Sequence, residues 1–170
     1  MAQQEFTDAI ALLKADHRTV EELFDKFENA TGKECKQKIA EQICTELKIH
    51  SMIEEEIFYP ALRGKIEDDL LDEAYVEHDG AKVLINDIMS GGADEEFYDA
   101  KVTVLSEEIE HHVEEEEMPK KGMFAQAREA DVDLVELRDQ MAARKEELKA
   151  QAESEGLPPA QMTAVNPQAA

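Results

Sequence analysis

Histidine and glutamate recur four residues apart at two places in this chain. The first pair is His50 and Glu54, and the second is His112 and Glu116. On an α-helix, residues four apart lie on the same face, one turn above the other. Each pair would therefore present an imidazole nitrogen and a carboxylate oxygen to one point. Nitrogen and oxygen donors of this kind bind iron, manganese or zinc.

Two further histidines, His17 and His78, occupy comparable positions in other parts of the chain. All four histidines fall within stripes of apolar residues at helical spacing, where leucine or isoleucine is expected. The four stripes are Ile10, Leu13, His17, Val20, Phe24, Phe27; Ile39, Ile43, Leu47, His50, Glu54, Ile57; Leu71, Ala74, His78, Ala81, Ile85, Ile88; and Val102, Leu105, Ile109, His112, Glu116.

Ionisable groups at core positions are unfavourable unless they are paired or bound to a metal. Four imidazoles and two carboxylates at one level of a helical bundle would lose their hydration without compensation. Two metal ions resolve the conflict, because two histidines can bind each ion while Glu54 and Glu116 bridge them. The predicted metal ligands are His17, His50, Glu54, His78, His112 and Glu116.

The stripes predict helices over about 8–29, 34–62, 67–90 and 94–118, with breaks at glycine and proline. Short connections favour antiparallel neighbours, so we predict an all-α, up-down four-helix bundle with an additional C-terminal helix. The bundle would span 1–122 and the helical extension 123–155, which would either pack along the bundle or mediate contact with a second copy or a protein partner. The tail 156–170 contains Pro158-Pro159 and is expected to be disordered.

The composition excludes several classes of function. The 170 residues include 41 acidic and 18 basic side chains, a formal net charge of −23. Such a surface repels phosphate backbones and anionic lipids, so we expect neither nucleic-acid nor membrane binding. The sequence has no apolar run of the roughly 20 residues that a membrane span needs. It also lacks a recognisable secretory signal, which predicts a cytoplasmic protein.

The arrangement resembles the hemerythrin-like (HHE cation-binding) family over about residues 5–125. The resemblance implies a non-haem diiron centre, oxo- or hydroxo-bridged, with manganese or zinc as other possible metals. It places His17 and His50 on one iron and His78 and His112 on the other. The matching segments are Asp16-His17-Arg18, the run HSMIEEEIFYP over 50–60, Glu77-His78-Asp79, and 110–119 with Glu110-His111-His112, Glu116 and Pro119.

The chain departs from the oxygen carriers of that family at two positions. Their second histidine on the third helix is replaced by Ala74, and Glu116 stands four residues after His112, where they have an aspartate five residues on. One iron would then lack a protein ligand, and Glu21 or water could fill the position. Such an iron is better suited to reaction with peroxide, O2 or NO than to stable O2 carriage.

Several residues near the predicted ligands could have either a structural role or a role at the metal site. His111 lies about 100° away from the stripe, so we expect it on the surface or behind the ligands, with His111 and Glu115 as an alternative ligand pair. Apart from Glu116, the run 114–117 is expected to be a solvated face. Tyr59 is expected to pack in the core, with a supporting contact to a ligand histidine as the alternative.

Three functions are compatible with the sequence. The first is a diiron protein that binds O2, NO or iron for sensing, storage or delivery. The second is a diiron enzyme that decomposes peroxide or carries out another small-molecule oxidation. The third is a metal-free acidic bundle that binds another protein.

Overall fold

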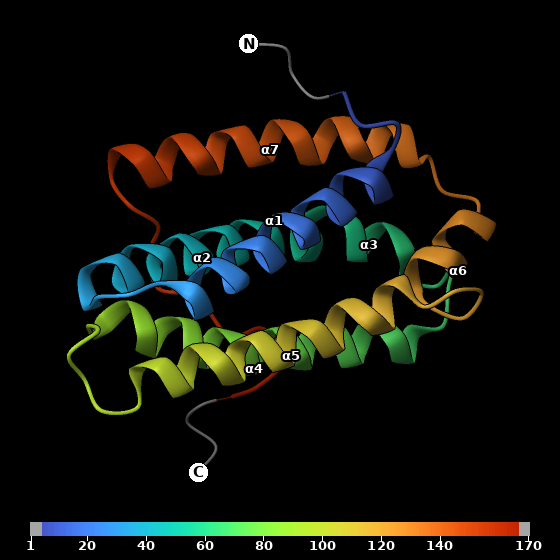
Figure 1. Ribbon diagram of the computed structural model, residues 1–170. Coiled ribbons are helices and arrows are strands. Elements are labelled where there is room, and N and C mark those ends of the chain that lie inside the picture. Colours follow the sequence, from blue (N-terminus) through green and yellow to red (C-terminus); the bar gives the residue numbers. More distant parts are fainter. Residues whose placement is uncertain (1–4, 167–170) are drawn as a thin grey trace.

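The computed structural model describes residues 5–166, which form helices and connecting loops without any strand (Figure 1). The bundle consists of α1 (Ala9–Asn29), α2 (Lys33–Ile53), α4 (Asp68–Ser90) and α5 (Tyr98–Glu117). Consecutive helices run antiparallel, which confirms the predicted up-down four-helix bundle. In the described part of the chain, no helix is long and apolar enough to span a bilayer.

The helix that carries His50 and Glu54 changes its winding directly after Ile53. α2 continues into a π-helical turn, η1 (Glu54–Phe58), and then into the short α3 (Tyr59–Leu62). In η1 the N–H of Tyr59 donates to the carbonyl of Glu54, five residues earlier. Pro60 follows, and its ring cannot fit against the carbonyl four residues before it in a regular α-helix. The wider turn thus brings Tyr59 onto the same face as Glu54.

The apolar core consists of two clusters separated by a polar layer. One cluster surrounds Leu13 and Phe58, and the other surrounds Val20 and Ile85. His17 lies between Leu13 and Val20 along α1, so it falls between the two clusters. The polar layer is therefore closed off from water on both sides by packed side chains.

The helical stretch predicted over 123–155 is interrupted near residue 130. It forms α6 (Met123–Glu129) and α7 (Leu134–Ser154), and Asp133 caps α7 by accepting from the N–H groups of Val135 and Glu136. In Figure 1, α7 lies along α1 and α2. Met141 and Leu148 of α7 are fully buried in the first core cluster. The region was expected either to pack along the bundle or to contact another chain, and α7 packs along the bundle.

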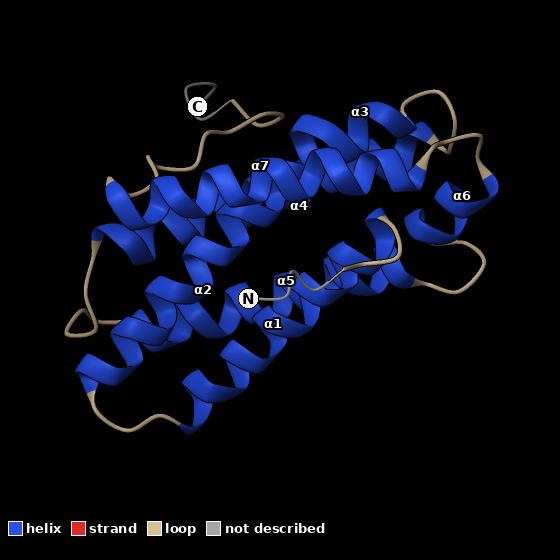
Figure 2. Cartoon of the chain, turned by 90° about the horizontal axis from the view of Figure 1, so that it is seen from above, coloured by secondary structure: helices blue, strands red, loops and turns tan. Residues whose placement is uncertain are grey.

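The tail was expected to be disordered, whereas residues 157–166 form an extended segment held by hydrogen bonds (Figure 2). The buried carboxylate of Asp79 accepts from the backbone N–H groups of Thr163, Ala164 and Val165 at 2.6–3.0 Å. These donors are backbone N–H groups, so the side chains of the tail give no pattern from which the contact could be predicted. The last four residues, 167–170, lie outside the described part.

The substitution Asp79→Ala is expected to release this segment from α4. Hydrogen bonds to a charged acceptor contribute about 1.5–3 kcal/mol each. Hydrogen exchange of the Thr163–Val165 amides should therefore accelerate about tenfold or more. Asp87→Ala on the same helix is the control, since exposed Asp87 pairs only with Lys101. Equal exchange in the two variants would contradict the anchoring role of Asp79.

Candidate metal centre

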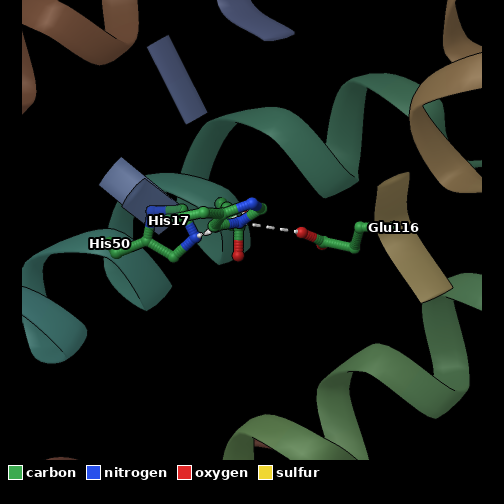
Figure 3. A group of neighbouring side chains, drawn as sticks. His17, His50 and Glu116 are labelled. Atoms are coloured by element: carbon green, nitrogen blue, oxygen red, sulfur yellow. Dashed lines mark hydrogen bonds and ion pairs between the residues drawn. The ribbon is translucent and has the colours of Figure 1, made fainter. Parts of the chain in front are cut away.

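All six predicted ligand side chains lie together in the polar layer between the two core clusters. Each is at most 6% exposed. Figure 3 shows His17 from α1, His50 from α2 and Glu116 from α5 turned toward one another. The six residues are His17, His50, Glu54, His78, His112 and Glu116.

The four histidines form two pairs. The Nε2 atoms of His17 and His50 are 3.2 Å apart, and those of His78 and His112 are also 3.2 Å apart. Each pair joins two different helices. Four inward-facing Nε2 atoms thus define two nitrogen-lined halves of one cluster.

Each glutamate spans the two halves. Glu54 has Oε1 3.1 Å from His50 Nε2 and Oε2 3.2 Å from His78 Nε2. Glu116 has Oε1 3.3 Å from His112 Nε2 and Oε2 3.3 Å from His17 Nε2. Both carboxylates therefore offer one oxygen to each half.

The electrostatics of the cluster show that its carboxylates require positive charge. Burial and the charge of Glu116 oppose ionisation of Glu54, but contacts with His50 outweigh them and lower the pKa of Glu54 to about 2. Burial disfavours protonated His50, yet the charge of Glu54 and hydrogen bonds raise the pKa of His50 to about 10. Each group thus favours the charged form of the other, so ionised Glu54 needs positive charge beside it.

The donor set fits metal ions. Among the described residues, Glu54 Oε1 and Glu116 Oε2 are buried oxygens that make no hydrogen bond. Buried polar atoms are normally satisfied, so these two need a further partner. Both oxygens face the His17–His50 pair, and a cation between them and these two histidines would provide that partner.

Carboxylates behind the cluster fix the orientation of every histidine. An ionised carboxylate only accepts, so each Nδ1 donates and each Nε2 is left to face inward. The contacts are His17 Nδ1 to Glu117 at 2.8 Å, His50 Nδ1 to Asp16 at 3.2 Å, His78 Nδ1 to Glu55 at 2.9 Å, and His112 Nδ1 to Glu77 at 3.1 Å.

The expectation that Glu117 belongs to a solvated face is wrong, because its carboxylate is bound to His17 and Arg18. The sequence alone contains no signal for this contact, since α1 and the end of α5 are about a hundred residues apart. The carboxylates behind His50 and His78 likewise sit within ordinary charged runs.

The C-terminal region supports these carboxylates from outside. Lys145 of α7 bonds to Asp16, which holds His50. The Thr163 hydroxyl donates to Glu55 Oε2 at 2.7 Å. The additional helix and the tail therefore complete the surroundings of the cluster.

Tyr59 is buried in the core as expected, and it also makes the contact with a histidine of the cluster that was its alternative role. Its hydroxyl lies 2.7 Å from Glu116 Oε1, 3.0 Å from Glu54 Oε2 and 3.2 Å from His78 Nε2. The side chain is fully buried, and both burial and the two carboxylates raise its pKa well above the usual value. The phenol oxygen is thus a seventh donor on the side of His78 and His112.

Glu21, considered as a ligand in place of the residue missing at Ala74, and His111, the alternative to His112, both lie outside the buried cluster. Glu21 is on the surface, where its side chain is 47% exposed and pairs with Arg18 at 3.2 Å. Ala74 is buried and offers no donor. His111 is 65% exposed and contacts Glu115 at 3.2 Å, outside the buried cluster.

A cavity of about 30 Å³ adjoins all four histidines. Neither bridging glutamate nor Tyr59 lines it. Its other walls are largely apolar, from Val20, Leu47, Ala81, Ile85, Ile109 and Val113, with Asp16, Ser51 and Lys82 completing them. A space of this size and polarity suits a molecule of two or three atoms.

Known proteins resemble this chain in sequence and in fold. The Hemerythrin family, described as the hemerythrin HHE cation binding domain, matches residues 8–127. The chain belongs to this family. A crystal structure of a hemerythrin HHE cation-binding domain-containing protein from Mycobacterium kansasii is similar to this HHE protein, with a TM-score of 0.72 and 25% sequence identity. The similarity covers 89% of this chain and 95% of that one. No curated protein sequence matches the chain.

Removing one buried donor is expected to remove metal, whereas removing His111 is not. His50→Ala and His112→Ala should each lose most of the metal that survives gel filtration in a chelator, because truncation leaves buried carboxylates without their partners. His111→Ala should keep the wild-type content of tightly held ions. Elemental analysis by mass spectrometry measures the metal-to-protein ratio. Equal loss from His111→Ala would make His111 a ligand of the buried centre.

Proposed function

We propose that the cluster is a diiron centre in which His17 and His50 hold one ion and His78 and His112 hold the other. Glu54 and Glu116 would bridge the ions. The observation that carries this proposal is the division of each carboxylate between the two histidine pairs. Bound iron would supply reversible redox chemistry toward O2, NO or peroxide.

Tyr59 supplies the oxygen that the second iron would otherwise lack. Its hydroxyl adjoins His78 and both bridging carboxylates, so it replaces the donor that Ala74 cannot provide. A cation beside the phenol would favour loss of its proton, since the positive charge opposes the effect of the two carboxylates. A set of imidazoles, carboxylates and a phenolate suits iron.

The first candidate function is binding of O2 or NO. The cavity beside the histidines accommodates a small, weakly polar molecule, and its apolar walls keep water away from it. Phe24 and Phe27 belong to the cluster on the same side and add to this exclusion. Storage or delivery of iron is less well supported, since all six predicted ligands are enclosed.

Peroxide decomposition is the second candidate, and Tyr59 favours it. A phenolate and two carboxylates place negative charge around the metal and thereby stabilise ferric over ferrous iron. Reversible O2 binding needs the ferrous state, whereas a ferric centre can react with peroxide. Stopped-flow spectra of the reduced protein with O2 or NO, compared with turnover of peroxide, distinguish the two: a reversible adduct supports binding, and sustained peroxide loss supports catalysis.

Metal content and absorption of the isolated protein test the proposal itself. We expect about two iron ions per chain and a visible band from charge transfer between phenolate and ferric iron. In Tyr59→Phe the band should disappear while the iron content is largely kept, because the histidines and glutamates remain. Tyr75→Phe, in a tyrosine that packs on Tyr59, is the control and should keep the band. Wild-type protein with a single ion, or without iron, would refute the diiron assignment.

Filling the cavity is expected to impair small-molecule binding without loss of metal. Ala81 lines the cavity and is buried. Because overpacking costs about 1–3 kcal/mol, Ala81→Val should weaken or slow binding of NO to the reduced protein about tenfold or more. Ala81→Ser changes the volume little and serves as the control. Unchanged NO binding in Ala81→Val at normal iron content would mean that the ligand does not use this cavity.

A further inference from the structure

A second group of metal-binding side chains lies on the outer face of the bundle. His111 and Glu115 of α5 repeat the four-residue spacing of the buried pairs, and Glu77 of α4 stands beside them. His111 Nε2 is 3.2 Å from Glu115 Oε1. One donor atom from each of the three residues lies within 4.8 Å of the other two. One imidazole and two carboxylates on two rigid helices can bind an ion on one side and leave the other side to water.

The charges of this group favour a cation. The two carboxylates lie close together, with one oxygen of Glu77 and one of Glu115 within 4.8 Å of each other. Among the described residues, neither carboxylate pairs with a lysine or an arginine; their charged contacts are with His112 and His111. His111 is 65% exposed, so solvent ions reach the group directly. An imidazole in the set favours a first-row transition metal over magnesium or calcium.

The outer group is also connected to the buried cluster. Glu77 accepts from His112 Nδ1 at 3.1 Å. A cavity of about 10 Å³ is lined by both outer carboxylates and by His112 and Glu116 of the buried cluster. Ala74 and Met123 form other parts of its wall, and an unbranched methionine can change rotamer to widen it. A larger side chain at position 74 would fill part of this cavity.

We propose that Glu77, His111 and Glu115 form an outer site for a divalent transition-metal ion. Ions held there pass along Ala74 to His112 and Glu116 and so load the buried centre. Binding at the outer site stands independently of the proposed diiron function. The transfer step rests on that function, because it requires a buried centre that takes up metal.

The outer site is tested first by titration of Co2+ into the full chain with its resident metal in place. Calorimetry should detect one additional ion per chain beyond the resident content. Glu115→Gln and His111→Ala should each lose that ion and keep the resident metal. Glu114→Gln is the matched control, since Glu114 is an exposed neighbour and the charge change is the same. No additional ion in the wild type, or equal binding in Glu115→Gln and Glu114→Gln, would refute the site.

The transfer step is tested by the rate of Fe2+ uptake into metal-free protein, followed by the absorption of the loaded centre. Uptake by Glu115→Gln should be about tenfold slower or more than uptake by Glu114→Gln, while the final iron content is the same. Equal rates would refute transfer and leave the calorimetric result to decide the site alone. If the wild type takes up no iron, transfer fails together with the diiron proposal, and the Co2+ titration still decides the outer site.

Discussion

Two carboxylates enclosed between apolar clusters are the constraint on which the arrangement of this protein depends. Glu54 and Glu116 lie in the polar layer, each almost without exposure. Charges in such surroundings are tolerated only when opposite charge is close. A protonated imidazole beside Glu54 can supply that charge, and metal ions would supply it when bound. The fold brings one histidine from each bundle helix to the layer, and this meets the requirement in both states.

Charge alternates outward from that layer. Each of the four buried histidines turns its outer nitrogen to a carboxylate, and for His17, His50 and His78 a lysine or arginine lies beyond that carboxylate. The series His50, Asp16 and Lys145 is an example. The lysine belongs to α7, which is outside the four-helix bundle. The tail contributes similarly, because Thr163 and Lys82 both contact Glu55. The C-terminal residues therefore hold the ligand histidines in position from a distance.

The sequence predicted the bundle and the convergence of the six side chains because both follow from helical periodicity. A histidine at a core position of each stripe points inward if the helix is regular, and the four bundle helices are regular at their histidines. Tyr59 lies in the core and contacts His78, as the two alternatives for it allowed. Its contacts with Glu54 and Glu116 were not expected, because it follows a π turn and regular periodicity puts it on another face than Glu54. The expectation that Glu117 faces solvent was wrong for a different reason. Its partner His17 is remote in sequence, and nothing in the sequence distinguishes Glu117 from the neighbouring glutamates.

The π turn also determines how the two sides of the centre differ. It brings the hydroxyl of Tyr59, a residue of the first core cluster, into contact with both Glu54 and Glu116. The histidines are left to line the opposite cavity, whose remaining walls come mostly from the second cluster. A small molecule in that cavity would meet the nitrogen side of the centre and would be separated from the phenol by the metal positions. Ala74 lines a different, smaller cavity beside the outer carboxylates. The route proposed for ions therefore differs from the cavity proposed for small ligands.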